Sequence, residues 1–352
     1  MVRIVILTIT ALAVVALLRI AFVVTPASGA LRALEPTGLA GCRTLEIASG
    51  TEDVAIDEAT GRVFVSTSER RSGAADPDNG IYAFELSDPE GALRRVSIDA
   101  PADFRPHGIS FWRGSGPDGD PRARLFVISH PSTGSVVLAY DVAEDGALTH
   151  TETISYEALR SPNDLVAVGP DAFYASNDIY FGDTLMGRVE AFLGLPLASV
   201  SYWDGASGRI AAGGLIYGNG IEVSEDGTEL YAASLLGRSV HVFARDAASG
   251  ALTRTGKLHA PLGVDNIERG PDGALYIGGH PQIFTFLDHQ RDPDVHAPSE
   301  VMRLDPQTGE WSIVFASTGE EIDASSVGAV HDGQLIVGAV FDSHILLCPY
   351  SG

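Results

Sequence analysis

The sequence predicts an all-β protein, a six-bladed β-propeller with an N-terminal hydrophobic helix and a short amphipathic helix over the channel face. Three observations lead to this prediction. The 352 residues are 45% hydrophobic and include 39 Gly and 19 Pro, which is typical of many short strands joined by tight turns. Hydrophobic alternation with a period of two recurs along the chain. One strand motif also returns six times, at intervals of roughly 45 to 60 residues, the spacing of propeller blades.

The repeated motif is a strand rich in aromatic and β-branched residues that follows a turn such as TG, EDG or PDG. Six units over about 320 residues leave about 53 residues each, enough for four short strands. A large two-sheet sandwich would also be rich in strands, but it does not account for the return of one motif. The six copies are GRVFVSTS from Gly61, ARLFVISH from Ala123, DAFYASND from Asp171, TELYAASL from Thr228, GALYIGGH from Gly273 and GQLIVGAV from Gly333.

The first 30 residues are expected to form a separate segment, with the propeller in residues 31–352. The run from Ile4 to Leu18 is almost wholly apolar, and after Arg19 the apolar character continues through Val24, before the small residues of TPASGA. This pattern predicts either a cleaved signal peptide or a retained membrane anchor. Both place the propeller outside the cytoplasm, so we expect a secreted, periplasmic or membrane-anchored protein.

The charge and the cysteines narrow the class of protein further. Acidic residues outnumber basic ones 46 to 23, for a net charge of -23, so the surface would repel a phosphate backbone and nucleic-acid binding is not expected. The two cysteines, Cys42 and Cys348, stand near the two ends of the expected propeller and have no zinc-site spacing. In an exported chain they predict a single disulfide, placed where an N-terminal strand would close the ring.

One segment, residues 182–196 (GDTLMGRVEAFLGLP), has the periodicity of an amphipathic helix. We expect its apolar face to pack over the propeller. The alternative is a surface helix that touches membrane or lipid near the N-terminal anchor. The apolar face consists of Leu185, Met186, Val189, Phe192 and Leu193.

Polar residues precede every repeated strand by about ten positions. In a propeller this is the innermost strand of a blade, whose end lines the central channel. Three of the five asparagines in the chain fall at these positions, which turn formation alone does not explain. Converging carboxylate and amide oxygens without a thiolate predict a hard cation, Ca²⁺ before Mg²⁺ or Mn²⁺. The six sets are Glu52 and Asp53, His107, Asn163 and Asp164, Asn219, Asp265 and Asn266, and Ser325 and Ser326.

Three of the ten histidines are expected near this ion: His107 on an inner strand, and His130 and His280 at the ends of second strands. The residues alone leave both acid–base catalysis and a structural role open for them. No GxSxG elbow, P-loop or HExxH motif is present. Aromatic residues expected at the channel mouth favour an apolar acyl or aromatic substrate over a sugar; they are Phe104, Phe111, Tyr217 and Phe181.

Several long motifs, in a consistent order from about Cys42 to Cys348, make the chain similar to the serum paraoxonase/arylesterase family of calcium-dependent lactonases. They are SGTEDVAID, FRPHGISF, VISHP, SPNDLVAVGPDAFYASND, GNGIEVSEDG, VDNIERGPDG, GGHPQ and SEVMRL. The resemblance implies two Ca²⁺ ions, the Cys42–Cys348 disulfide, and membrane or lipid contact through the N-terminus and the 182–196 helix. The chain departs from the family pattern at Ile179, where relatives commonly have a histidine, and at Gly279, where some carry a free cysteine.

The resemblance also implies residue roles, carried over by position. For the catalytic Ca²⁺ these residues are Glu52, Asn163, Asn219, Asp265 and Asn266, and for a structural Ca²⁺ they are Asp53, Asp164 and the backbone carbonyl of Ile109. The implied catalytic dyad is His107 and His130, and the substrate-pocket residues are His280, Tyr217, Asn177 and Asp178.

The function implied is calcium-dependent hydrolysis of lactones and aryl esters, with Ca²⁺ polarising the ester carbonyl and His107 acting as general base on water. Asp265 is an alternative, as a nucleophile. A sugar-lactone or organophosphate hydrolase on the same site is a second possibility. A third is a non-catalytic, Ca²⁺-stabilised propeller that binds a partner at the membrane.

Overall fold

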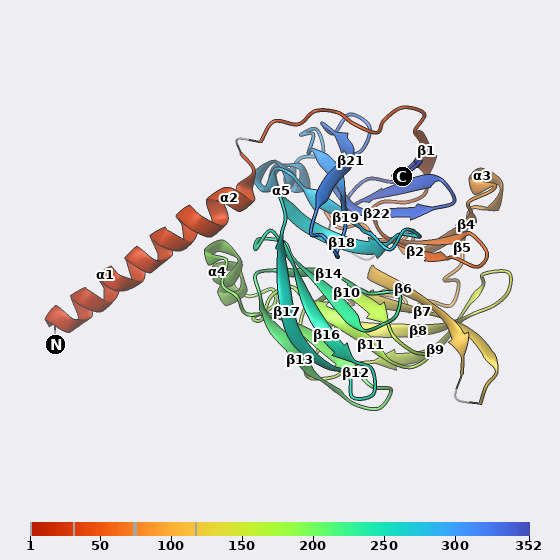
Figure 1. The fold of residues 1–352 in the computed structure, drawn as a ribbon, viewed down its shortest axis with the longest axis horizontal. Coiled ribbons are helices and arrows are strands. Elements are labelled where there is room, and N and C mark those ends of the chain that lie inside the picture. Colours follow the sequence, from red (N-terminus) through yellow and green to blue (C-terminus); the bar gives the residue numbers. More distant parts are fainter. Residues whose placement is uncertain (1, 31, 73–75, 117) are drawn as a thin grey trace.

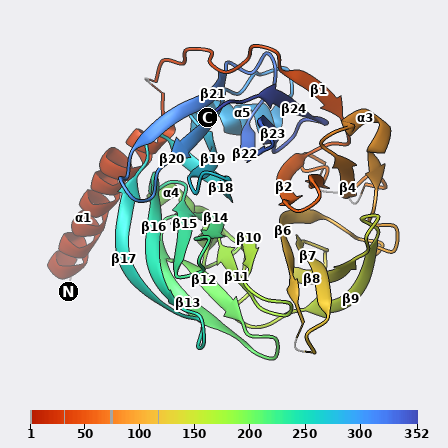
Figure 2. The ribbon, with the colours of Figure 1, turned by 45° about the vertical axis from the view of Figure 1, so that its right-hand side comes forward.

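The computed structural model describes residues 2–30, 32–72, 76–116 and 118–352. Within them, six four-stranded antiparallel sheets stand around a central channel, which confirms the six-bladed propeller (Figures 1 and 2). From the channel outwards, the first three blades are β2 (Thr51–Asp57), β3 (Arg62–Thr67), β4 (Gly80–Glu85) and β5 (Arg94–Arg95); β6 (Pro106–Ser115), β7 (Pro121–Ser129), β8 (Val136–Val142) and β9 (Leu148–Ile154); and β10 (Pro162–Ala167), β11 (Phe173–Asn177), β12 (Ala198–Trp203) and β13 (Gly208–Leu215).

The other three blades have the same order. They are β14 (Gly218–Val223), β15 (Glu229–Ser234), β16 (Ser239–Asp246) and β17 (Ala251–His259); β18 (Gly263–Arg269), β19 (Leu275–His280), β20 (Ser299–Leu304) and β21 (Trp311–Ser317); and β22 (Ser325–His331), β23 (Gln334–Ala339), β24 (His344–Pro349) and β1 (Arg43–Glu46). Each copy of the repeated motif forms the second strand of its blade: β3, β7, β11, β15, β19 or β23. The hydrophobic core lies between neighbouring blades, as where Phe64 of β3 joins Leu125 and Val127 of β7 in one buried cluster.

The ring is closed by the N-terminal strand. β1 pairs antiparallel with β24 and becomes the outermost strand of the last blade. A disulfide joins Cys42, just before β1, to Cys348 in β24, across 306 residues of sequence, as predicted. A cross-link over such a long loop stabilises the folded state by up to about 5 kcal/mol in the chain-entropy account.

The N-terminal segment is an apolar helix that projects away from the propeller (Figure 1). It comprises α1 (Val2–Arg19), the π-helical turn η1 (Ile20–Val24) and α2 (Thr25–Ser28). Residues Arg3–Ser28 are long and apolar enough to cross a membrane, and a signal sequence would have the same properties. Arg19 Nε donates to the Leu193 carbonyl at 3.1 Å, which gives the arginine within the apolar run a partner on the propeller side. The expected division after residue 30 falls beside residue 31, which is outside the described residues.

The predicted amphipathic helix is α4 (Leu185–Leu193), and it lies over the channel face as expected, since its Val189 and Phe192 line the cavity there. The expected packing of its whole apolar face against the propeller is wrong, because Leu185 and Phe192 are 77% and 62% exposed. The helix is held instead by Glu190, a buried residue whose carboxylate accepts hydrogen bonds from the backbone N–H groups of Tyr180 and Phe181. An amphipathic pattern shows that a helix has an apolar face, but it does not show whether protein or lipid covers that face.

Two further helices lie outside the sequence prediction. The short α3 (Pro89–Ala92) follows β4, and α5 (Ile283–Arg291) follows β19. α4 and α5 both lie on the side of the ring from which α1 projects (Figure 1). Both contribute side chains to the cavity described next.

Candidate active site in the propeller channel

The channel opens toward α4 and α5 into a cavity of about 980 Å³. Side chains of the inner strands line it together with apolar side chains of the two helices. Nine of the residues singled out in the sequence line this one cavity: Glu52, His107, His130, Asn163, Asp178, Tyr217, Asn219, Asp265 and His280.

A break in strand register explains how the polar side chains reach the channel. Every inner strand has one where its polar residue lies, and a β-bulge redirects the side chain it contains. Close approach of neighbouring inner strands requires glycine here, because a Cβ on Gly220 would lie 2.4 Å from the Asp265 carbonyl oxygen. The six shifts fall between Thr51 and Asp53, Pro106 and Ile109, Pro162 and Leu165, Gly218 and Ile221, Val264 and Ile267, and Ser325 and Val327.

Several of the side-chain oxygens at these positions have no hydrogen-bond partner among the described residues. All five residues expected to hold the catalytic ion are between 0% and 7% exposed. Leaving a buried polar atom unsatisfied costs about 1–3 kcal/mol, so a cluster of such atoms indicates that something else satisfies them. Oxygens without a thiolate are the ligands that Ca²⁺ prefers, and the residues therefore fit this ion. Among these five residues, the buried oxygens without a hydrogen-bond partner in the described part of the chain are Glu52 Oε2, Asn163 Oδ1, Asn219 Oδ1 and Asn266 Oδ1.

The pKa values of the two carboxylates in this cluster, Asp265 and Glu52, are shifted in opposite directions. Burial raises the pKa of Asp265, and its contact with His280, with 2.8 Å between Oδ2 and Nε2, only partly offsets this. Burial by itself would raise the pKa of Glu52 as well. The neighbouring His107 and Arg70 outweigh this effect, and the net result is a pKa lowered to about 2. Glu52 is therefore an anion at any ordinary pH, and it is the fixed negative charge around which a cation can bind.

The residues expected to hold the structural ion also tie blades together. Asp53 Oδ2 accepts a hydrogen bond from the Ile109 N–H at 2.7 Å, and Asp164 Oδ2 accepts one from the Ile221 N–H at 2.8 Å. Each carboxylate thus spans from one inner strand to the next. Burial raises the pKa of Asp53 and of Asp164 well above its usual value.

The two predicted catalytic histidines form a chain of hydrogen bonds. His107 Nε2 lies 3.2 Å from Glu52 Oε1, and His107 Nδ1 lies 2.9 Å from His130 Nε2. His130 Nδ1 continues the chain to Ser135 Oγ at 2.9 Å. Burial, with the neighbouring His107, lowers the pKa of His130 well below its usual value, so this ring is neutral. The arrangement can carry a proton away from the site. Ser135 was missed because it stands in a turn with no motif of its own.

Several pocket residues lie elsewhere than expected. Asn177 is not among the residues lining the cavity: its Oδ1 accepts from the Arg160 and Ser161 N–H groups, so it holds a loop. Phe104 is buried between the first two blades, and Phe111 lines a second cavity at the other end of the channel. Tyr217 does line the cavity, whereas Phe181 is 40% exposed outside it. The other apolar walls come from residues that no sequence pattern singled out, among them Leu235, Ile283, Phe286, Leu287 and Phe341.

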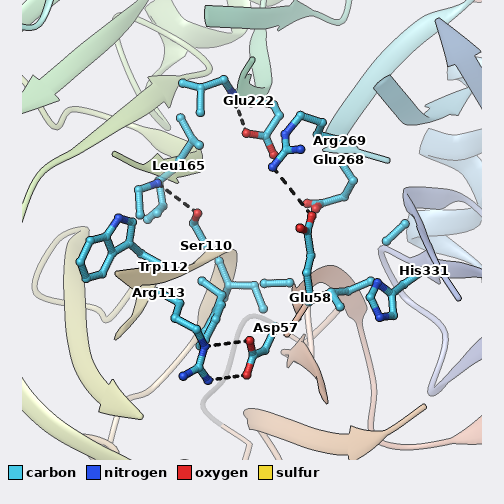
Figure 3. A pocket seen from close by; sticks show the side chains of 18 of the residues that line it. Asp57, Glu58, Ser110, Trp112, Arg113, Leu165, Glu222, Glu268, Arg269 and His331 are labelled. Atoms are coloured by element: carbon cyan, nitrogen blue, oxygen red, sulfur yellow. Dashed lines mark hydrogen bonds and ion pairs between the residues drawn. The ribbon is translucent and has the colours of Figure 1, made fainter. Parts of the chain in front are cut away.

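The second cavity, of about 690 Å³, is polar and differs in chemistry from the first (Figure 3). A bidentate ion pair joins Arg113 to Asp57, and Arg269 lies 3.8 Å from Glu58. Burial raises the pKa of Glu222 to about 7. The two arginines of this cavity already face carboxylates, and its described residues form no imidazole–carboxylate chain like that of His107.

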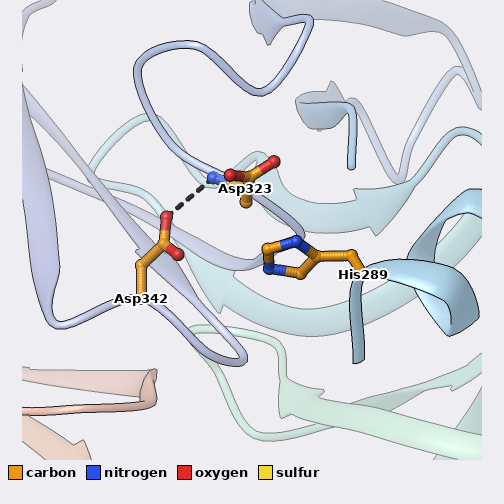
Figure 4. A group of neighbouring side chains, drawn as sticks. All are labelled: His289, Asp323 and Asp342. Carbon is orange, nitrogen blue, oxygen red and sulfur yellow. Dashed lines mark hydrogen bonds between the residues drawn. The ribbon is translucent and has the colours of Figure 1, made fainter. Parts of the chain in front are cut away.

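One other cluster has atoms spaced for a metal, His289, Asp323 and Asp342, with ligand atoms within 4.8 Å of one another (Figure 4). Its histidine is already used on both sides: Nε2 faces Arg71 Nη2 at 2.7 Å, and Nδ1 faces the Val295 carbonyl at 2.6 Å. Asp342 accepts from the Asp323 N–H at 2.8 Å. Unlike the channel cluster, this group is internally satisfied, and it anchors a guanidinium.

The chain is similar to known proteins over most of its length. A family model described as "Arylesterase" matches residues 71–349. The chain is 35% identical to serum paraoxonase/arylesterase 1 of Rattus norvegicus over 91% of each chain. It is 34% identical to serum paraoxonase/arylesterase 2 of Gallus gallus, over 89% of this chain and 90% of the relative. It is 33% identical to serum paraoxonase/arylesterase 1 of Homo sapiens with the same coverage.

Solved structures support the fold alone. A luciferin-regenerating enzyme superposes with a TM-score of 0.57 at 12% identity, covering 88% of this chain and 97% of that one. A gluconolactonase of Xanthomonas campestris superposes with a TM-score of 0.54 at 17% identity, covering 90% and 96%. Both likenesses extend over nearly the whole chain.

Fold and channel together define a six-bladed propeller with an oxygen-rich cavity at one end of its channel. The chain belongs to the arylesterase family of the serum paraoxonases, and is thus a carboxylic-ester hydrolase. Membership implies a calcium cofactor, which the unsatisfied oxygens independently fit. The apolar N-terminal helix and the disulfide indicate an extracytoplasmic or membrane-associated protein.

Proposed function

We propose that this protein is a calcium-dependent hydrolase of lactones and aryl esters. The observation that carries the proposal is the cluster of buried, unpartnered oxygens beside the His107–His130 chain, in a cavity with apolar walls. Glu52, Asn163, Asn219, Asp265 and Asn266 would hold the catalytic ion. When bound, Ca²⁺ supplies a Lewis acid for the ester carbonyl and for the negative charge that develops on its oxygen.

The chain's own residues would move the proton. His107 takes it from the attacking water at one ring nitrogen, while its other ring nitrogen, Nδ1, donates a hydrogen bond to Nε2 of His130, which Ser135 orients. A structural ion held by Asp53, Asp164 and the Ile109 carbonyl would neutralise the two carboxylates with raised pKa values and stiffen the channel. The apolar walls favour an alkyl or aryl group over a sugar.

The test is turnover with and without calcium. We expect the purified protein to hydrolyse phenyl acetate and γ- or δ-lactones with alkyl chains faster than gluconolactone. EGTA should abolish turnover before circular dichroism shows unfolding, and added Ca²⁺ should restore it. Unfolding in EGTA without any prior turnover on these substrates would instead favour a calcium-stabilised binding propeller. Preference for gluconolactone would favour a sugar-lactone hydrolase.

We also infer that the α4 face contacts lipid alongside the N-terminal helix. The exposed side chains of Leu185, Met186 and Phe192 lie near η1, to which α4 is linked through Arg19. In lipid nanodiscs, amide exchange in α4 should be faster for a Leu185→Glu/Met186→Glu variant than for the unsubstituted chain. Ile98→Glu, an equally exposed apolar site away from α4, is the control and should change nothing. Equal exchange in all three would contradict lipid contact.

A further inference from the structure

Arg70 is a cation inside the substrate cavity that makes very few contacts. It follows β3, lines the cavity, and its side chain is 17% exposed. Among the described residues its guanidinium makes one hydrogen bond, from Nη2 to the Pro106 carbonyl at 3.3 Å. Nη2 lies 3.6 Å from Glu52 Oε2, beyond hydrogen-bond range. Its Nε is buried without a partner. Most donors of this guanidinium are thus unused, in a place where water is largely excluded.

The charge balance around Arg70 changes when the proposed cation is bound. The three carboxylates whose charge acts on Arg70 are Glu52, Asp265 and Asp53. All three belong to the sets that would hold calcium, so their negative charge is shared with a divalent ion in the loaded protein. Arg70 then lacks an anion of its own. A desolvated guanidinium without an anion is costly, and the cavity supplies no other carboxylate among those acting on it.

The cavity is also more basic than the rest of the chain. The protein as a whole has 46 acidic and 23 basic residues. Four arginines line the cavity, as many as the carboxylates that line it, so its lining is balanced where the surface is strongly acidic. The arginines are Arg70, Arg105, Arg188 and Arg291. Two of these, Arg188 and Arg291, are 77% and 71% exposed and pair with Asp183 and Asp288. Arg105 pairs with Asp103 at 2.7 Å, which leaves Arg70 as the most buried cation, with unused donors.

We propose that Arg70 binds a carboxylate on the substrate, so that the enzyme prefers lactones and esters that carry one. The inference rests on the proposed function and narrows its substrate class. A planar guanidinium with adjacent free N–H donors pairs with a carboxylate in two parallel hydrogen bonds, which a point charge does not. The hydrocarbon part of such a substrate would lie against the apolar walls, and its ester carbonyl would face the cation that the oxygen cluster would hold.

The test compares two lactones of equal size, 5-oxotetrahydrofuran-2-carboxylate and its carboxamide. We expect kcat/KM to be at least about tenfold higher for the carboxylate, and Arg70→Gln to lower this ratio by about 10- to 100-fold, chiefly through KM, as loss of a charged hydrogen-bond pair does. Arg291→Gln, which removes the same charge at the exposed rim, should leave the ratio within about twofold. Calcium affinity of each variant is measured alongside, because Arg70 lies near Glu52.

A binding measurement separates this inference from the proposed function. The hydrolysis product of the first lactone, 2-hydroxyglutarate, should bind the calcium-loaded protein in calorimetry, and Arg70→Gln should weaken it at least about tenfold. If both lactones are hydrolysed but the carboxylate-to-carboxamide ratio of kcat/KM is the same in Arg70→Gln as in the unsubstituted protein, Arg70 only balances the nearby carboxylates and the inference is overturned.

If neither lactone nor phenyl acetate is hydrolysed, the proposed function fails, and the binding of 2-hydroxyglutarate still tests Arg70. Equal binding by Arg70→Gln and the unsubstituted protein would then reject the role of Arg70.

Discussion

Asn163→Ala is expected to lower the turnover of phenyl acetate and of alkyl lactones by roughly a thousandfold, with the propeller still folded. The side chain contributes a buried oxygen with no hydrogen-bond partner among the described residues, so its removal would delete a proposed calcium ligand and leave no donor stranded. Losing the Lewis acid is worth several kcal/mol in the transition state, which corresponds to this factor. Steady-state kinetics and calcium titration calorimetry check it together, since both should fall.

Asn79→Ala is the matched control for this prediction. Asn79 is equally buried, but its Oδ1 accepts from the Glu69 N–H and its Nδ2 donates to the Phe104 carbonyl. Its loss should lower the melting temperature while calcium affinity stays near that of the unsubstituted protein. Asn163→Asp keeps the oxygen and should recover calcium binding. Full turnover by Asn163→Ala, or equal calcium loss in both alanine variants, would contradict the proposed ligand set.

His107→Gln should reduce lactone turnover by about 10²- to 10⁴-fold, the usual worth of a general base. Its two ring nitrogens connect Glu52 to His130, and glutamine can fill the space but cannot accept and pass on a proton. The loss should lie in kcat, with calcium affinity changed far less than in Asn163→Ala. Proton-inventory and pH–rate measurements should lose the dependence that a titrating base produces.

The alternative role of Asp265 has its own signature. If Asp265 attacks as a nucleophile, its carboxylate displaces the alcohol and forms a mixed anhydride with the acyl group, which water then hydrolyses. Attack of H₂¹⁸O on the Asp265 carbonyl of this anhydride leaves the label in Asp265, where mass spectrometry of the peptide detects it. Attack by water activated at His107 places the label in the product acid alone. Unchanged turnover in His107→Gln, with labelled Asp265, would remove His107 from the mechanism and leave the calcium ligands in place.

The sequence predicted the ring and the axial residues because both depend on repetition. Asn163, Asn219 and Asp265 share one position in their blades, and pseudo-rotational symmetry brings equal positions together. Asn177 shows the limit of residue type as a guide. Asn177 is also buried, but its side-chain oxygen already accepts hydrogen bonds from the backbone N–H groups of Arg160 and Ser161. Only the structure reveals these contacts.

Features that depend on irregular contacts were missed. The bulges arise where the inner strands crowd together at the propeller axis, so the conformational propensities of the local residues do not predict them. α5 alternates polar and apolar residues too weakly to stand out, and the apolar face of α4 was assigned to the propeller because the sequence does not state what covers it. Ser135 and Arg70 reach the site from turns and loops, where side-chain direction follows from tertiary packing alone.

Because β1 completes a blade whose other strands, β22 to β24, follow the other five blades in the sequence, the circle of sheets stays open until β24 has been synthesised. Fragments ending before β24 would therefore expose both edges of the gap. Covalent closure of the ring also needs an oxidising environment, because the disulfide between Cys42 and Cys348 forms and persists only under such conditions. Maturation of the enzyme is thereby tied to its delivery outside the reducing interior of the cell.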